Sequence, residues 1–186
     1  MSLELILILL CIFINAFFSA SEIAVVTARR SKIKQMIEEG QANAETMQRL
    51  KSDPDRFLAT VQVGVTLAGA CASAIGGAAA VTNLKPYISM IPVAFISGSS
   101  EAIAIGLVVL IITYISLIFG ELIPKSLALS NPEGVGLRTA PIVDWFSRIA
   151  TLFVKLLTGS TNFLLKPFGR KAFTERGYVS EEEVKL

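Results

Sequence analysis

The chain has 186 residues, with 17 Lys and Arg against 15 Asp and Glu, a formal net charge of +2 and no histidine. Hydrophobic residues make up 53% of it and charged residues only 17%, whereas soluble domains carry about 25% charged residues. Together with a mean hydropathy of +0.63, this composition indicates a membrane protein. The absence of histidine excludes zinc proteases of the HExxH kind and Ser/His dyads.

The first apolar segment predicts a membrane-spanning helix over residues 1–28. Spanning helices need roughly 20 mainly apolar residues. A cleavable signal peptide is the alternative, but it would begin with a basic region, and Glu4 stands there instead. We therefore interpret the segment as a retained helix. Asn15, Ser19 and Glu22 follow the spacing i, i+4, i+7, which places them in one polar stripe.

Residues 29–53 are predicted to form a cytoplasmic juxtamembrane helix around Lys32 to Lys51. Positive charge gathers on both sides of this segment, whereas the connector at 82–98 has only Lys85. Because an excess of Lys and Arg marks cytoplasmic loops, we expect the amino terminus outside and the carboxyl terminus in the cytoplasm. The charges concerned are Arg29, Arg30, Lys32, Lys34, Arg49, Lys51 and Arg56.

A second span is predicted over residues 54–81, with Asp53 as its N-cap and Pro54 at the first helical position. It also carries a stripe of small or polar residues. The first interpretation of this stripe is a helix-packing seam, because small residues four apart let helix backbones approach closely. The second is an oxygen-rich face for an ion. The stripe consists of Gln62, Thr66, Gly69, Ser73 and Gly77.

An extracellular connector over 82–98 leads to a third span over 99–128, which Ser99 or Ser100 is expected to cap. The span ends in "FGELIPKS", where Pro124 cannot donate a hydrogen bond to the carbonyl of Gly120. A free carbonyl beside Glu121, with hydroxyls from two other helices, would form an all-oxygen set. Hard cations such as Mg²⁺ and Ca²⁺ prefer such ligands, and soft metals do not.

Glu22 has three possible roles at this stage. It could be a direct ligand, it could pair with Arg29 seven residues later, or it could lie at a cytoplasmic cavity where it attracts the cation. An intramembrane aspartyl protease is a third, disfavoured function, because such enzymes need two aspartates within spans, and Asp53, Asp55 and Asp144 lie outside them.

Residues 129–172 are predicted to form interfacial amphipathic helices. Asp144, Arg148 and Lys155 fall on one helical face, and a charged stripe opposite a broad apolar face is typical of a helix lying in the membrane interface. A fourth span is the alternative, and we favour the interface. Residues 173–186 are expected to begin a truncated cytoplasmic region.

Three stretches resemble the transmembrane domain of the CorC / cyclin M family of magnesium transporters: "FFSASEIAVVTARRSKIKQM", "FLATVQVGVTLAGACASAIGG" and "FGELIPKSLA". The resemblance implies an all-α membrane protein with three transmembrane helices plus cytoplasmic juxtamembrane amphipathic helices. It also implies a homodimer in the lipid of the inner (plasma) membrane. Such proteins continue into a cytoplasmic nucleotide-binding regulatory domain, which is absent from this chain.

The implied function is Mg²⁺ export, coupled to inward Na⁺, by a protein that is not an enzyme and binds no nucleic acid. Carried over residue by residue, the resemblance implies that the metal is coordinated by Ser19, Gly69, Ser73, Gly120 and Glu121. Many relatives have asparagine where this chain has Gly69, so a backbone carbonyl would replace a side-chain oxygen there. The alternative function is a Mg²⁺-sensing membrane scaffold that regulates another transporter and holds the ion as a structural element.

Overall fold

The structure, a computed structural model, describes residues 2–165, and every regular element in that range is helical. Within it, three segments are long and apolar enough to cross a membrane, which confirms the predicted spans. They are α1 (Ser2–Thr27), α4 (Pro54–Asn83), and the consecutive helices α7 (Ser100–Leu117), η1 (Ile118–Leu122) and α8 (Ile123–Ser130). The chain is therefore an all-α, multi-pass membrane protein.

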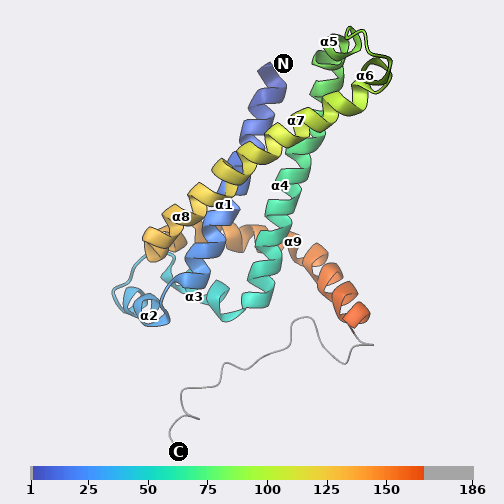
Figure 1. The fold of residues 1–186 in the computed structure, drawn as a ribbon. Helices are drawn as coiled ribbons and strands as arrows, with labels where there is room; N and C mark the ends of the chain where they lie inside the picture. Colours follow the sequence, from blue (N-terminus) through green and yellow to red (C-terminus); the bar gives the residue numbers. More distant parts are fainter. Residues whose placement is uncertain (1, 166–186) are drawn as a thin grey trace, which may run out of the picture.

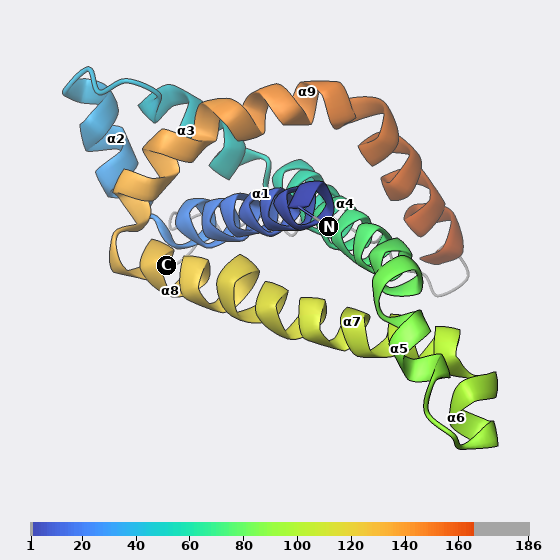
Figure 2. The ribbon, with the colours of Figure 1, turned by 90° about the horizontal axis from the view of Figure 1, so that it is seen from above.

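The first span lies at the centre of the bundle. α7 and α8 pass along one side of α1, and α3 (Ala44–Ser52) and α9 (Pro132–Leu165) lie along the other side (Figure 2). α9 runs across the bundle rather than along it (Figure 1). The short helices α5 (Lys85–Ser89) and α6 (Ala94–Gly98) lie at one end of the bundle, and α2 (Arg30–Glu38) and α3 lie at the other.

The packing seam of α4 is one residue away from the predicted one. Its buried small residues recur every four positions, which lets α1 and α7 approach its backbone closely: they are Gly64, Ala68, Ala72, Gly76 and Ala80. The predicted seam through Gly69, Ser73 and Gly77 is not the buried one: these residues are only half-buried, and a Cβ built on Gly69 would meet nothing within 4 Å. Adjacent helical residues point about 100° apart, so the predicted stripe lies beside this contact, and a Cβ on Gly77 would reach Ile105 of α7 at 3.8 Å.

The segment between the first two spans forms two helices, α2 and α3, and not the single predicted helix around Lys32 to Lys51. Gly40 has a φ of +69°, a left-handed conformation that ends α2. The Gly40 N–H donates to the Ile37 carbonyl at 2.9 Å, and the Gln41 N–H donates to the Met36 carbonyl at 2.8 Å. This pair of bonds is a Schellman motif, and it turns the chain back so that α3 packs beside α2.

The predicted helix starts are correct in position. Asp53 caps α4, since its Oδ1 accepts a hydrogen bond from the Arg56 N–H at 3.3 Å, and Pro54 is the first helical residue. Ser99 occupies the N-cap position of α7, but its side chain makes no capping hydrogen bond.

The hydrophobic core lies where α2, α3 and α9 join α1 and α4. Phe18 of α1 belongs to it, with its ring centroid 4.9 Å from that of Phe146 on α9. On the outer surface of α9, Trp145, Leu152 and Leu156 are exposed, as expected for a helix that contacts lipid. Arg148 donates to Asp144 on the same helix at 2.7 Å. The predictions for residues 166–172 and 173–186 lie outside the described residues.

Candidate functional site

The polar face of α1 is buried against the third span. Asn15 is 3% exposed and Ser19 is fully buried. Asn15 Nδ2 donates a hydrogen bond to Ser116 Oγ on α7 at 3.2 Å. Asn15 Oδ1 and Ser19 Oγ are both buried and make no hydrogen bond in the described structure. Because a buried polar atom without a partner is costly, these two oxygens mark a place where a ligand would be stabilising.

The "FGEL" stretch of the third span forms the π-helical turn η1, in which the Ile123 N–H donates to the Ile118 carbonyl five residues earlier. A proline-broken α-helix was predicted here, and the structure instead widens the helix by one residue just before Pro124. Such π turns occur frequently at functional sites. Gly120 is buried in the turn, and a Cβ at this position would lie 2.7 Å from Asn15 Nδ2 and 3.2 Å from Ser116 Oγ. Only a glycine lets α1 approach this closely.

Two carboxylates from different helices share one lysine. Lys125 Nζ lies 3.5 Å from Glu22 Oε2 on α1 and 3.9 Å from Glu121 Oε2 on η1. Each of the three side chains is about one-third exposed. The predicted alternative pairing of Glu22 with Arg29 is thus replaced by a pairing with Lys125. The backbone N–H of Arg29 donates instead to Glu133 Oε1 at 3.3 Å.

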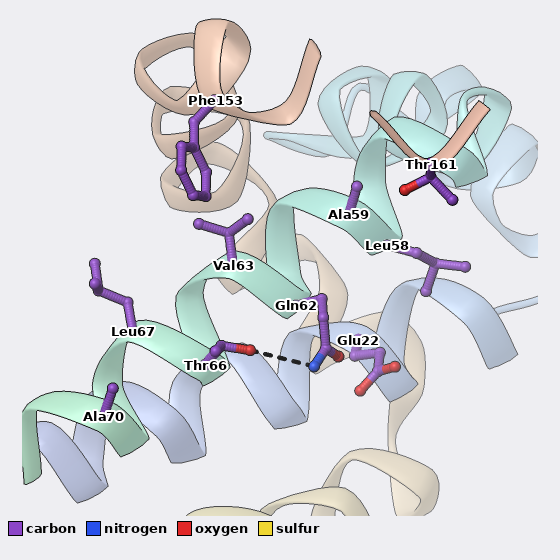
Figure 3. Close-up of a pocket in the computed structure, with 10 residues that line it drawn as sticks. All are labelled: Glu22, Leu58, Ala59, Gln62, Val63, Thr66, Leu67, Ala70, Phe153 and Thr161. Carbon is purple, nitrogen blue, oxygen red and sulfur yellow. Dashed lines mark hydrogen bonds between the residues drawn. The ribbon is translucent and has the colours of Figure 1, made fainter. Parts of the chain in front are cut away.

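The polar stripe of α4 lies beside its packing seam and borders open space at Gly69. Gln62 and Thr66 are exposed, Gly69 and Ser73 are half-buried, and Gln62 Nε2 donates to Thr66 Oγ1 at 3.3 Å. A pocket of about 690 Å³ opens over part of this face (Figure 3). Its lining comes from α1, α4 and α9: Glu22, Leu58, Ala59, Gln62, Val63, Thr66, Leu67, Ala70, Phe153 and Thr161.

Figure 3 shows the Glu22 carboxylate beside the Gln62 amide at one edge of this pocket, while Phe153 stands at the other edge. The pocket is therefore apolar over most of its wall and polar where α1 and α4 meet. Glu22 lines the pocket and also reaches Lys125, so it links the open face of α4 to the acid on η1.

The structure thus assembles part of the predicted ligand set. Gly120 lies against Asn15, and Ser19 follows Asn15 by one turn on the same buried face. Glu121 is joined to Glu22 through Lys125. Gly69 and Ser73 are half-buried on the α4 stripe.

Sequence reasoning missed Ser116 and Lys125 as members of this region. The spacing of Lys125, four residues after Glu121, could have suggested their ion pair. The contact of Ser116 with Asn15 spans 101 positions in the chain, and no local pattern marks it.

The chain matches a family of known proteins over most of its length. The profile described as "Cyclin M transmembrane N-terminal domain" matches residues 6–186. The chain belongs to the cyclin M family. It is 36% identical over 184 residues to "UPF0053 protein sll0260" of Synechocystis sp., covering 99% of this chain and 40% of that protein.

Similar relatives occur in other bacteria. "UPF0053 protein YugS" of Bacillus subtilis is 35% identical over 99% of this chain and 43% of its own length. "UPF0053 inner membrane protein YfjD" of Escherichia coli is 28% identical over 92% of this chain and 37% of its own length. The chain therefore spans about two fifths of the length of these cyclin M relatives.

Proposed function

We propose that this cyclin M domain carries Mg²⁺ across the membrane, with the ion held between α1, α4 and η1 by hydroxyl, carboxylate and backbone carbonyl oxygens. The observation that supports it most is the fully buried Ser19 hydroxyl without a hydrogen-bond partner, on the helix that packs against the π turn of Gly120 and Glu121. Carboxylate, hydroxyl and carbonyl oxygens are the ligands that hard divalent cations prefer.

In this proposal, Ser19, Gly120 and Glu121 form the part of the site between α1 and η1. Gly69 and Ser73 supply the α4 side, where the space beside Gly69 leaves room for the ion or for water that it retains. Glu22 stands at the edge of the pocket on α4 and attracts the cation toward the site.

The domain is proposed to sit in the inner (plasma) membrane with the amino terminus outside, because the positively charged residues gather around α2 and α3. Export driven by Na⁺ entry, assembly as a homodimer and control by a cytoplasmic nucleotide-binding region are proposals that rest on the family resemblance.

The test is Mg²⁺ binding and Mg²⁺ efflux by the purified chain, the latter measured in vesicles loaded with the ion. Glu121→Gln keeps the shape of the side chain and removes its charge, so we expect a loss of affinity of at least about 10-fold and a matching loss of efflux. Glu101→Gln is the matched control, because Glu101 lies in the first turn of the same span and pairs with Lys85.

Unchanged binding and efflux in Glu121→Gln would show that the proposed site is wrong. Tight Mg²⁺ binding by the wild type without efflux would favour the sensing scaffold over the transporter.

A further inference from the structure

The proposed function gives no role to Lys125. Its ammonium lies within 4 Å of two carboxylates that come from different helices, Glu22 on α1 and Glu121 on η1. A lysine on a membrane helix commonly extends its flexible chain toward the water at the membrane surface. Here the side chain is only one-third exposed and its charge is directed to the pair of acids.

The charges of these three groups decide what else can bind there. Two carboxylates and one ammonium carry a net charge of −1. A divalent cation in place of the ammonium would bring the pair of acids to zero. Both cations together would leave an excess of +1 and would repel each other at short range. The ammonium and a divalent cation are thus alternative partners of the same carboxylates.

We propose that Lys125 is a tethered counter-cation that competes with the transported ion. When no divalent ion is bound, its ammonium neutralises Glu22 and Glu121. When the ion binds Glu121, Lys125 withdraws from that carboxylate. This inference rests on the proposed function, because it assigns a role to Lys125 at the same site.

The competition has two consequences for transport. It weakens binding, because the apparent affinity of a ligand falls with the fraction of protein that is competent to bind it. It also favours release, since the ammonium can take over the carboxylates as the ion leaves. Without the Lys125 ammonium, the empty site would retain two uncompensated carboxylates inside the bundle, which is unfavourable.

The first experiment compares Lys125→Met with the wild type in Mg²⁺ binding and in efflux from loaded vesicles. We expect the variant to bind Mg²⁺ about 10-fold more tightly, within the usual range of coupling between sites, and to export it more slowly at saturating Mg²⁺. Lys125→Arg keeps the charge and should bind Mg²⁺ as the wild type does. The matched control is Lys85→Met, because Lys85 pairs with Glu101 at the other end of the bundle.

An affinity in Lys125→Met that is equal to or weaker than that of the wild type, in protein with an unchanged melting temperature, overturns the inference. If the variant does not fold, a second measurement on the wild type replaces it. Amine acetylation of Lys125, followed by mass spectrometry, should rise several-fold when Mg²⁺ saturates the protein, while that of Lys85 stays constant. Labelling of Lys125 that falls or stays constant with Mg²⁺ also overturns it.

The two proposals fail in different ways. If the wild type binds and exports Mg²⁺ and Glu121→Gln abolishes both, but Lys125→Met leaves the affinity unchanged, only the role of Lys125 is wrong. A wild type that neither binds nor exports Mg²⁺ removes the proposed function and the role of Lys125 together.

Discussion

Gly64 of α4 packs directly on the ring of Phe18 of α1. A Cβ built on Gly64 would lie 2.6 Å from two carbons of that ring, a separation at which something must move. Phe18 in turn packs against Phe146 of α9, so its ring has little freedom to shift. This contact sets how closely the first two spans approach, and thereby where the polar face of α1 lies.

We therefore predict that Gly64→Ala destabilises the domain. Forcing extra carbon into a packed contact costs about 1–3 kcal/mol, which exceeds the gain of about 0.5–1 kcal/mol from replacing glycine by alanine in a helix. The melting temperature in detergent should fall. Gly69→Ala on the same helix is the control, because its Cβ would enter open space, and its melting temperature should rise slightly or stay unchanged. Equal shifts in the two variants would contradict the packing that we describe.

A second prediction concerns the π turn. Gly120→Ala places a Cβ 2.7 Å from Asn15 Nδ2, so either α1 or η1 must move, and the oxygens around Ser19 move with it. We expect Mg²⁺ affinity to fall by about 10-fold, as for changes in groups that orient metal ligands. Gly106→Ala, on the preceding helix α7, meets no atom within 4 Å and should bind Mg²⁺ normally. Calorimetric titration of both variants measures the difference, and equal affinities would argue against a site beside Gly120.

A third prediction concerns the attachment of α9 to α4. Arg56 donates from Nε to Ser147 Oγ and from Nη2 to Thr151 Oγ1, both at 3.1 Å. Arg56→Met removes both bonds, and we expect a loss of about 2 kcal/mol together with faster proteolytic cleavage within α9. Arg148→Met is the control, because Arg148 pairs with Asp144 on its own helix and such exposed pairs contribute about 0–1 kcal/mol. Cleavage at equal rates in both variants would count against this attachment.

A fourth prediction concerns the end of α1. Lys51 of α3 donates from Nζ to the carbonyl oxygens of Val25 and Val26, both at 2.9 Å, and these carbonyls belong to the last turn of α1, which lacks intrahelical donors. Lys51→Met should lower the melting temperature, with a loss of about 2 kcal/mol. Lys34→Met, at an exposed lysine of α2, should change it little. A Lys51→Met variant as stable as the wild type would show that these bonds contribute nothing.

The same lysine predicts a pH dependence. Burial lowers the pKa of Lys51 below its usual 10.5, as does the nearby charge of Arg30, whereas Glu133 acts in the opposite direction. Between the lowered pKa and 10.5 the unfolded chain binds more protons than the folded one, so this lysine makes stability rise with pH. The contribution of Lys51 to the stability of the fold is complete above pH 10.5 and is lost as the pH falls through the folded-state pKa of this lysine.

Melting temperatures of the wild type and of Lys51→Met, measured from neutral pH up to 10.5, test this dependence. The advantage of the wild type should widen as the pH rises, because methionine cannot titrate. An advantage that stays constant across this range would mean that the pKa of Lys51 is the same in the folded and unfolded chain.

The three spans could be predicted from the sequence because each depends on local properties. Burying a peptide backbone in lipid requires about 20 consecutive apolar residues, and that run is visible without knowledge of its neighbours. The cap at Asp53 and Pro54 is equally local, since both residues act on the first turn of the helix that they begin. Gly40 was also visible, but its effect depended on its adopting a positive φ and ending α2.

Only the tertiary structure decided which faces meet. Small residues occur almost all round α4, so Gly69, Ser73 and Gly77 offer a seam as plausible as Ala68, Ala72 and Gly76. The choice was made by the Phe18 ring of α1 and by Ile112 of α7, which fill the space beside Gly64 and Gly76. Shape complementarity between helices far apart in the chain has no local pattern in the sequence.

In the candidate site, too, some features could be predicted from the sequence and others were decided by the fold. The sequence by itself determined that Ser19, Gly120 and Glu121 are oxygen-bearing positions on apolar helices, because polar groups in such segments are rare and costly. The partners of these helices came from the fold. Lys125 reaches Glu22 and Asn15 reaches Ser116 because α1 is held between the third span and α9, and a contact across about 100 residues depends on that packing rather than on any spacing along the chain.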